Sequence, residues 1–345
     1  MSEPQYPIDL PTDDQVRTYL LENAEAARTL GIESDFEVRF LARGAVNAAY
    51  QLSVPGQVDR VLRIALCAAN RSSVKPQVEC EAAVLQFLSG QNVTADLAWI
   101  DLHSGMGYPL LAIGYLDGDP LDYRSAHLKA AARLYARLHN QTEEPPAIVP
   151  RVPDPMTQYL KEAQVWVDRY RHWSDANSVT IAAFDAALDR IRARSIEFDQ
   201  MRLIHGDGTW SNWRIQAEEA RIMDWDWCRV TTPAADLAHF LSPITTGRLR
   251  GRLLSREEEN GVLVEYCAER RIGLIEFERL FRGMRSIVVF HSITWTAAYL
   301  VQLAQAQPVT ADDQEPEFLK VLKTSGLAQQ LDPEFLDWMK HENIW

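Results

Sequence analysis

The sequence predicts an α+β protein in which a small, strand-rich first part precedes a larger and mainly helical second part. Hydrophobic residues alternate with polar ones in short runs over residues 36–66 and again over 97–116, whereas helical spacing dominates from about residue 126 onward. A chain of 345 residues with 47% hydrophobic content can bury a sizeable core and has room for two domains. We expect the two parts to join within residues 116–121, where Asp, Gly and Pro lie between a strand and a helix.

The first part of the chain predicts one helix, an antiparallel sheet and a second helix. Residues 13–31 begin with an Asp cap, continue with apolar residues at helical spacing and end at Gly31, which predicts an N-terminal helix. Residues 76–88 return to helical spacing. Strand patterns occur at residues 36–42, 47–54, 60–66, 97–103 and 108–116. We therefore predict an N-terminal helical extension over residues 1–35 and a sheet-containing lobe over residues 36–117.

The second part, residues 118–345, predicts a helical lobe interrupted by short strands. Amphipathic helices are expected at residues 128–140, 158–173 and 179–194. Short strands are expected near residues 202–206, 212–216 and 220–226. Helices resume around Asp236 and continue toward the C-terminus.

Composition excludes several classes of function. The net charge of −13 argues against nucleic acid as the main partner, because that binding depends on clustered Lys and Arg. The four cysteines form no C-x-x-C pair and predict reduced thiols. The N-terminus lacks the features of a secretory signal, and no apolar run approaches the roughly 20 residues of a transmembrane helix, so we expect a cytoplasmic protein without a membrane partner.

The most informative stretch runs from Leu203 to Arg229. Asp207 is followed after four intervening residues by Asn212, and a predicted strand then ends in Asp224. In kinase-type phosphoryl transfer one carboxylate orients the attacking hydroxyl, and an Asn and a second Asp bind Mg²⁺, which prefers oxygen ligands. Asp207 therefore suits the base, and Asn212 and Asp224 suit the metal ligands.

The segments HGDGTWSN, IMDWDW and PAADLAHFL together resemble the aminoglycoside phosphotransferase and choline kinase superfamily. This resemblance implies a protein-kinase-like fold with two lobes, in which a small antiparallel-sheet lobe binds ATP and a larger helical lobe carries the substrate pocket. It assigns Asp207 as the catalytic base and Asn212 and Asp224 as metal ligands. It also implies that His205 and Asp236 support the catalytic loop.

The first lobe resembles the same family in LARGAVNAAYQL, VLRIAL and VECEAAVLQFL, which occur in the expected order. The resemblance, which extends from about Phe36 to Leu241, implies that Gly44 to Asn47 cover the nucleotide phosphates. It also implies that Arg63 contacts the phosphates and that Glu81 holds Arg63 by an ion pair. Arg63 departs from the commoner Lys, which differs from Arg in shape and in pKa behaviour. The hinge-like segment LLAIGYLDG would receive adenine on the backbone of Gly114, Tyr115 and Leu116.

The sequence leaves two alternative roles open for several residues near the motifs. Asp226 faces the substrate or a second metal, or else it is a solvated turn residue. Asp236 either caps the helix that follows it or also braces the loop. Core packing is the preferred explanation for the tryptophan cluster, and the alternative is an aromatic wall for an organic or cationic substrate, for which Trp210 is the best candidate. The other tryptophans of this cluster are Trp213, Trp225 and Trp227. His139 and His239 receive no special role.

The function implied by the resemblance is transfer of the γ-phosphate of ATP, with Mg²⁺, to a hydroxyl group of a small molecule. The acceptor classes are aminoglycosides, amino alcohols and sugar metabolites. One alternative is a catalytically silent nucleotide-binding protein, which Arg63 and the unusual loop interior keep open. A protein kinase is a weaker alternative, because no APE-type segment follows Asp224.

Overall fold

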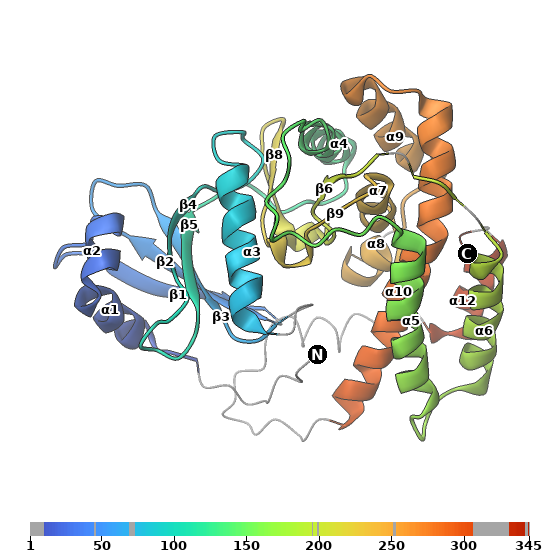
Figure 1. Cartoon of the computed structure of the whole chain (residues 1–345), viewed down its shortest axis with the longest axis horizontal. Coiled ribbons are helices and arrows are strands. Elements are labelled where there is room, and N and C mark those ends of the chain that lie inside the picture. Colours follow the sequence, from blue (N-terminus) through green and yellow to red (C-terminus); the bar gives the residue numbers. More distant parts are fainter. Residues whose placement is uncertain are drawn as a thin grey trace.

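The computed structural model describes residues 10–44, 46–68, 73–194, 196–198, 200–250, 253–305, 331–341 and 344. A sheet with its helices forms one side of the molecule, and a group of helices forms the other side (Figure 1). The predicted α+β architecture is thereby confirmed.

The N-terminal segment forms two short helices, α1 (Asp13–Glu22) and α2 (Ala24–Leu30), so the prediction of one continuous helix is wrong. Asn23 separates them, with φ −88° and ψ 96°, and its side-chain oxygen accepts a hydrogen bond of 3.0 Å from the Ala26 backbone N–H. An Asn side chain that satisfies a free N–H in this way starts a new helix. Gly31 ends α2 in the left-handed conformation, as its sequence position suggests.

Five strands form a single sheet in the order β1-β2-β3-β5-β4, with every neighbouring pair antiparallel. The strands are β1 (Glu37–Arg43), β2 (Asn47–Ser53), β3 (Arg60–Ala65), β4 (Leu97–Asp101) and β5 (Leu110–Gly114). Each of the five overlaps a run that the sequence predicts as a strand, and β1 extends one residue beyond its run, to Arg43. Helix α3 (Val74–Phe87) lies between β3 and β4 in the chain.

Helices cover both faces of this sheet. Along β5, Leu110 and Ala112 belong to the buried cluster that includes residues of α1 and α2. The alternate residues Leu111 and Ile113 belong to a larger cluster that includes α3 and the helices of the second part. Because strand side chains alternate between faces, α3 joins the sheet to the rest of the molecule while α1 and α2 shield its other face.

The second part of the chain is mainly helical. Its helices are α4 (Ser125–His139), α5 (Pro155–Arg171), α6 (Ser178–Arg192), α7 (Ala234–Phe240), α8 (Pro243–Arg250), α9 (Arg256–Arg270), α10 (Leu274–Gln305) and α12 (Pro333–His341). The long helix α10 packs along α5 and α7. In the part of the chain that the structure describes, no helix combines the length and apolar character needed to cross a membrane.

Two strand pairs and two 3₁₀ turns interrupt these helices. The strands are β6 (Arg202–Ile204), β7 (Trp213–Gln216), β8 (Glu219–Ile222) and β9 (Arg229–Thr231), and the turns are η1 (Trp210–Asn212) and η2 (Trp225–Trp227). Strand β6 pairs with β9, and β7 pairs with β8, both antiparallel. The sequence did not predict β9, because its three residues are too few to show alternation.

A close contact joins the connection between the two parts to β7. Asp119 and Ile215 exchange two backbone hydrogen bonds of 2.9 and 2.8 Å. The preceding Gly118 has φ 121°, and a Cβ atom there would lie 2.7 Å from the Ile215 carbonyl oxygen. Only glycine suits this position, so the chain entering the second part is held beside the strand that follows η1.

Candidate active site

The loop of residues 205–212, which follows β6, is anchored by one buried carboxylate. Asp236, in the first turn of α7, accepts hydrogen bonds from the backbone N–H groups of His205 at 2.8 Å and Gly206 at 2.7 Å. The Nε2 atom of His139, from α4, lies 3.1 Å from the same carboxylate. Burial works to raise the pKa of Asp236, but His139 and the loop N–H groups lower it below its ordinary value. Asp236 therefore stays ionised and fastens the loop to two helices.

The buried His205 ring makes one hydrogen bond within the loop and a second to a neighbouring segment. Its Nδ1 accepts a 3.2 Å hydrogen bond from the Asp207 backbone N–H, and its Nε2 lies 3.0 Å from the carbonyl oxygen of Met223. Because a carbonyl only accepts, Nε2 carries the proton and the ring is neutral. Burial lowers the pKa of His205, which agrees with this tautomer. His205 therefore links the loop to the segment that carries Asp224.

Gly206 brings the loop close to η2. Its φ is 82°, and a Cβ atom would lie 2.5 Å from the Trp227 carbonyl oxygen. Any other residue would strain the backbone and displace this contact. The glycine therefore lets loop 205–212 and the DWD segment, residues 224–226, lie side by side.

Asp207 points its carboxylate toward two side chains. Asn212 Nδ2 donates to the Asp207 carbonyl oxygen at 2.9 Å and to the carboxylate Oδ2 at 3.2 Å. The other carboxylate oxygen lies 3.8 Å from Nε2 of His239 on α7. Since the Asn212 amide nitrogen is turned toward Asp207, its Oδ1 is the atom left to act as a metal ligand.

Asp224 lies beside Asn212 because the Met223 N–H donates to the Asn212 carbonyl oxygen at 2.9 Å. Asp224 follows β8, has φ 74°, and leaves its side chain 35% exposed. A non-glycine residue in the left-handed region is uncommon and is found at functional sites. The backbone thus turns the Asp224 carboxylate out of the strand direction toward the sheet of the first part.

Side chains of the sheet meet this carboxylate. Arg63 of β3 forms ion pairs with Glu81 of α3 and with Asp224, where the guanidinium Nη2 lies 2.6 Å from Oδ1. The same nitrogen lies 3.8 Å from Oδ2 of Asp226, which also accepts a 2.9 Å hydrogen bond from Nδ2 of Asn47. Arg63, Glu81 and Asp226 are all buried. Residues distant in sequence therefore converge on the DWD segment from both parts of the molecule.

One guanidinium faces three carboxylates in this cluster. Oxygen atoms of Glu81, Asp224 and Asp226 all lie within 4.8 Å of one another. Burial, reinforced by the charge of Asp224, raises the pKa of Asp226 well above its ordinary value. Burial works in the same direction on Asp224, but Arg63 holds its pKa below the ordinary value. The cluster is rich in hard oxygen ligands and short of positive charge, which suits a divalent cation.

The remaining predicted residues lie in the turn between β1 and β2 and at the end of β5. Gly44 is exposed in the β1–β2 turn and donates a 2.8 Å hydrogen bond to the Asn47 carbonyl oxygen, whereas Ala45 lies outside the described residues. In the hinge-like segment, the Gly114 and Tyr115 N–H groups donate to the carbonyls of Asp96 and Asp59, both at 3.0 Å. Leu116 is buried.

Burial in the structure distinguishes between several of the alternative roles that the sequence left open. The solvated-turn reading of Asp226 is wrong, because the residue is only 5% exposed. Trp213 and Trp225 are fully buried, which agrees with core packing, and Trp225 donates a 3.0 Å hydrogen bond to Thr94. Trp210 is partly buried and packs against the large core cluster.

Two histidines to which the sequence assigned no role lie at the site. His139 braces Asp236, and His239 faces Asp207. His239 follows Asp236 by one helical turn, so the two side chains share a face of α7. The three-residue spacing from Asp236 could have identified His239 from the sequence. His139 lies 97 residues before Asp236, and no local sequence pattern relates the two.

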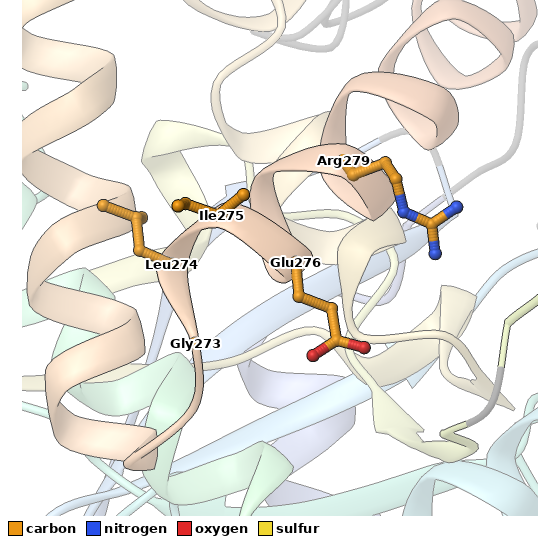
Figure 2. A pocket seen from close by; sticks show the side chains of 5 residues that line it. All are labelled: Gly273, Leu274, Ile275, Glu276 and Arg279. Atoms are coloured by element: carbon orange, nitrogen blue, oxygen red, sulfur yellow. The ribbon is translucent and has the colours of Figure 1, made fainter.

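A hollow of about 600 Å³ lies elsewhere, around the first turn of α10 (Figure 2). It is lined by Gly273, Leu274, Ile275, Glu276 and Arg279, and the Ile275 side chain is 86% exposed. None of these residues belongs to the motifs of the second part. The candidate active site is therefore loop 205–212 with the DWD segment and Arg63.

The fold and this site together define a protein of the kinase-like phosphotransferase class. Residues 37–271 match the phosphotransferase enzyme family, and the chain belongs to that family. The resemblance predicted from the sequence is thus confirmed. A search by sequence among curated proteins returns no match.

Solved structures share the fold over nearly the whole chain. Choline kinase from Cryptosporidium parvum is 12% identical, with a TM-score of 0.64 and coverage of 96% of this chain and 98% of that one. A choline/ethanolamine kinase family protein from Mesorhizobium loti is 15% identical, with a TM-score of 0.63 and coverage of 96% and 97%. Spectinomycin phosphotransferase, solved with ADP and spectinomycin, is 14% identical, with a TM-score of 0.61 and coverage of 94% and 99%. At these identities the likeness establishes the fold alone.

Proposed function

We propose that this protein transfers the γ-phosphoryl group of ATP to a hydroxyl group of a small molecule. One observation carries the proposal: Asp207, Asn212 and Asp224 are brought together on a hydrogen-bonded loop and strand end, and Arg63 reaches them from the sheet. Kinase-type transfer needs a base beside the acceptor and cations beside the phosphates. The site contains both kinds of group in adjacent positions.

In this proposal Asp207 orients the acceptor hydroxyl and accepts its proton. Its backbone is held by His205, and its carboxylate by Asn212, so the side chain has a defined direction before substrate binds. Preorganisation of this kind lowers the cost of reaching a reactive geometry. The rigid loop therefore contributes to catalysis by positioning a carboxylate that is itself a weak base.

The nucleotide would lie between the sheet and loop 205–212. The β1–β2 turn, from Gly44 to Asn47, would cover the phosphates, and Arg63 would pair with phosphate oxygens. In the hinge-like segment the N–H groups of Gly114 and Tyr115 already have partners, so adenine would use other backbone groups there. Spectinomycin phosphotransferase, which shares this fold, was solved with ADP.

The residues at the site fit a divalent cation. Asn212 Oδ1 and the Asp224 carboxylate would hold Mg²⁺, and Asp226 offers a further carboxylate. Few protein ligands are needed, because phosphates and waters complete the coordination of Mg²⁺. When bound, the ion would offset the negative charge of the phosphate oxygens.

The acceptor is proposed only as a class, namely an aminoglycoside-like compound, an amino alcohol or a sugar metabolite. Proteins of this fold include choline kinase and spectinomycin phosphotransferase, so the fold does not select the acceptor. We propose Trp210, a partly buried residue of η1 within loop 205–212, as a side chain that would contact such an acceptor.

Calorimetric titration with ATP, with and without Mg²⁺, tests the nucleotide site. Wild type is expected to bind ATP more tightly with Mg²⁺, and Asp224→Ala is expected to lose that gain. Asp14→Ala, at an exposed position of α1, serves as the control and should behave as wild type. Binding that is absent in every condition would refute the proposal.

ADP release in the presence of candidate acceptors tests the transfer step. Asp207→Asn is expected to keep Mg·ATP binding while turnover falls about 10²- to 10⁴-fold, the usual contribution of a general base. Nucleotide binding without turnover on any acceptor would instead favour the catalytically silent alternative.

A further inference from the structure

The Arg63 guanidinium stands where the proposed metal ligands need a positive charge. It is 9% exposed, and one of its nitrogens pairs with Glu81 while the other lies 2.6 Å from Asp224 Oδ1. The second nitrogen is also 3.8 Å from Asp226 Oδ2. Arg63 is therefore a cation that faces all three acidic side chains and makes its close ion pairs with Glu81 and Asp224.

A guanidinium suits this arrangement better than an ammonium group. Its planar fork places two donors in fixed positions, so Arg63 spans Glu81 and Asp224 at the same time. A lysine would bring one compact charge on a flexible stem and could not hold both carboxylates with the same geometry. Arg63 therefore pairs with Asp224 more firmly than the commoner Lys would.

A divalent cation and Arg63 compete for the same carboxylate. Two positive groups on one carboxylate repel each other, and the burial of Arg63 weakens the screening of this repulsion by solvent. The nearest oxygen of Asp226, Oδ2, is 3.8 Å from the guanidinium and accepts the hydrogen bond from Asn47, so the close pairing of this guanidinium nitrogen is with Asp224. The cation can bind Asp224 fully only when Arg63 moves away from it.

We propose that Arg63 acts as an internal competitor that keeps the divalent cation off Asp224 until polyphosphate is present. Phosphate oxygens supply Arg63 with another anionic partner, so they release Asp224 to the ion. The cation and the nucleotide then strengthen each other's binding by the same factor. This inference rests on the proposed function for the identity of the polyphosphate, but the competition itself involves only this chain and the cation.

Titration with Mn²⁺ in the absence of nucleotide tests the competition directly. The free Mn²⁺ signal in electron paramagnetic resonance reports how much ion the protein holds. Arg63→Met is expected to bind Mn²⁺ about ten-fold more tightly than wild type or better, the value of one hydrogen bond between charged groups. Arg63→Lys, which keeps the charge and loses the fork, is expected to fall between the two.

A matched control lies three residues away on the same strand. Arg60 donates to the Leu30 carbonyl oxygen and to Gln57, both at 3.0 Å, and pairs with none of the three carboxylates. Arg60→Met should therefore bind Mn²⁺ as wild type does. Adding Asp224→Ala to Arg63→Met should remove the gain and thereby place the ion on Asp224.

The outcomes separate this inference from the proposed function. Equal or weaker Mn²⁺ binding in the Arg63 variants overturns the inference, since Arg63 would then organise the site and not compete for it. If Arg63→Met does not fold, Arg63→Lys alone decides, because its Mn²⁺ affinity must still exceed that of wild type. Failure to find any phosphoryl acceptor leaves these titrations unaffected, because they contain no nucleotide.

Discussion

Asp236→Asn is expected to be the most damaging single-atom change in the loop anchor. The native carboxylate accepts hydrogen bonds from the N–H groups of His205 and Gly206 and contacts His139, all without exposure to water. An amide replaces one acceptor oxygen by a donor, so one N–H group is left buried and unpaired. Losing a charged hydrogen bond costs about 1.5–3 kcal/mol and an orphaned buried donor about 1–3 kcal/mol. We therefore expect the free energy of unfolding to fall by about 3–5 kcal/mol.

Urea unfolding followed by tryptophan fluorescence measures this loss. The control is Asp154→Asn, since Asp154 caps α5 with a 3.0 Å hydrogen bond from Thr157 N–H and Asn is an equally good cap. The control should stay within about 0.5 kcal/mol of wild type. If the free energy of unfolding of Asp236→Asn lies within about 1 kcal/mol of the wild-type value, Asp236 does not anchor the loop as argued. Loss of a buried hydrogen bond to a charged group should cost more than that.

Two further predictions concern packing and pH. A Cβ on Gly208 would run into the Tyr135 hydroxyl, which is buried and lacks a hydrogen-bond partner among the described residues, so Gly208→Ala should lower the melting temperature and added Tyr135→Phe should restore much of it. No rescue in the double variant would contradict this contact. Burial lowers the pKa of His139, His205 and His291 from the ordinary value of 6.5. Near and below that pH the unfolded chain therefore binds more protons than the folded protein does. The free energy of unfolding should rise as the pH is raised from about 5 to 7. Urea unfolding across this range checks the slope, and a flat or falling profile would count against burial of the neutral rings.

The sequence was sufficient where the signal is local. Strand alternation in residues 36–66 and helical spacing after residue 126 led to the correct architecture, because both patterns arise from the geometry of neighbouring residues. The spacing of Asp207 and Asn212 is likewise local, since both lie on one short loop that ends in η1. Asp224 ends a hairpin that begins just after this loop, so its nearness to Asn212 follows from pairing of adjacent strands.

Only the tertiary structure decided features that depend on distant segments. The sequence left Asp226 open as a solvated or a functional residue, and the structure shows it buried and hydrogen-bonded to Asn47, 179 residues away. His139 and His239 gained their positions only when α4 and α7 packed around Asp236 and Asp207. Very short elements were also not predicted. Strand β9 has only three residues, too few for an alternating pattern, and it forms by pairing with β6.

The sequence alone therefore indicated which residues would carry the proposed chemistry and in what order, because a base and metal ligands need particular functional groups at short spacing. The structure decided how those groups are charged. Arg63 and Asp224 are separated by 161 residues, yet their contact holds the pKa of the Asp224 carboxyl below its ordinary value. Burial and electrostatic coupling arise from packing across the whole chain, and no local pattern records them.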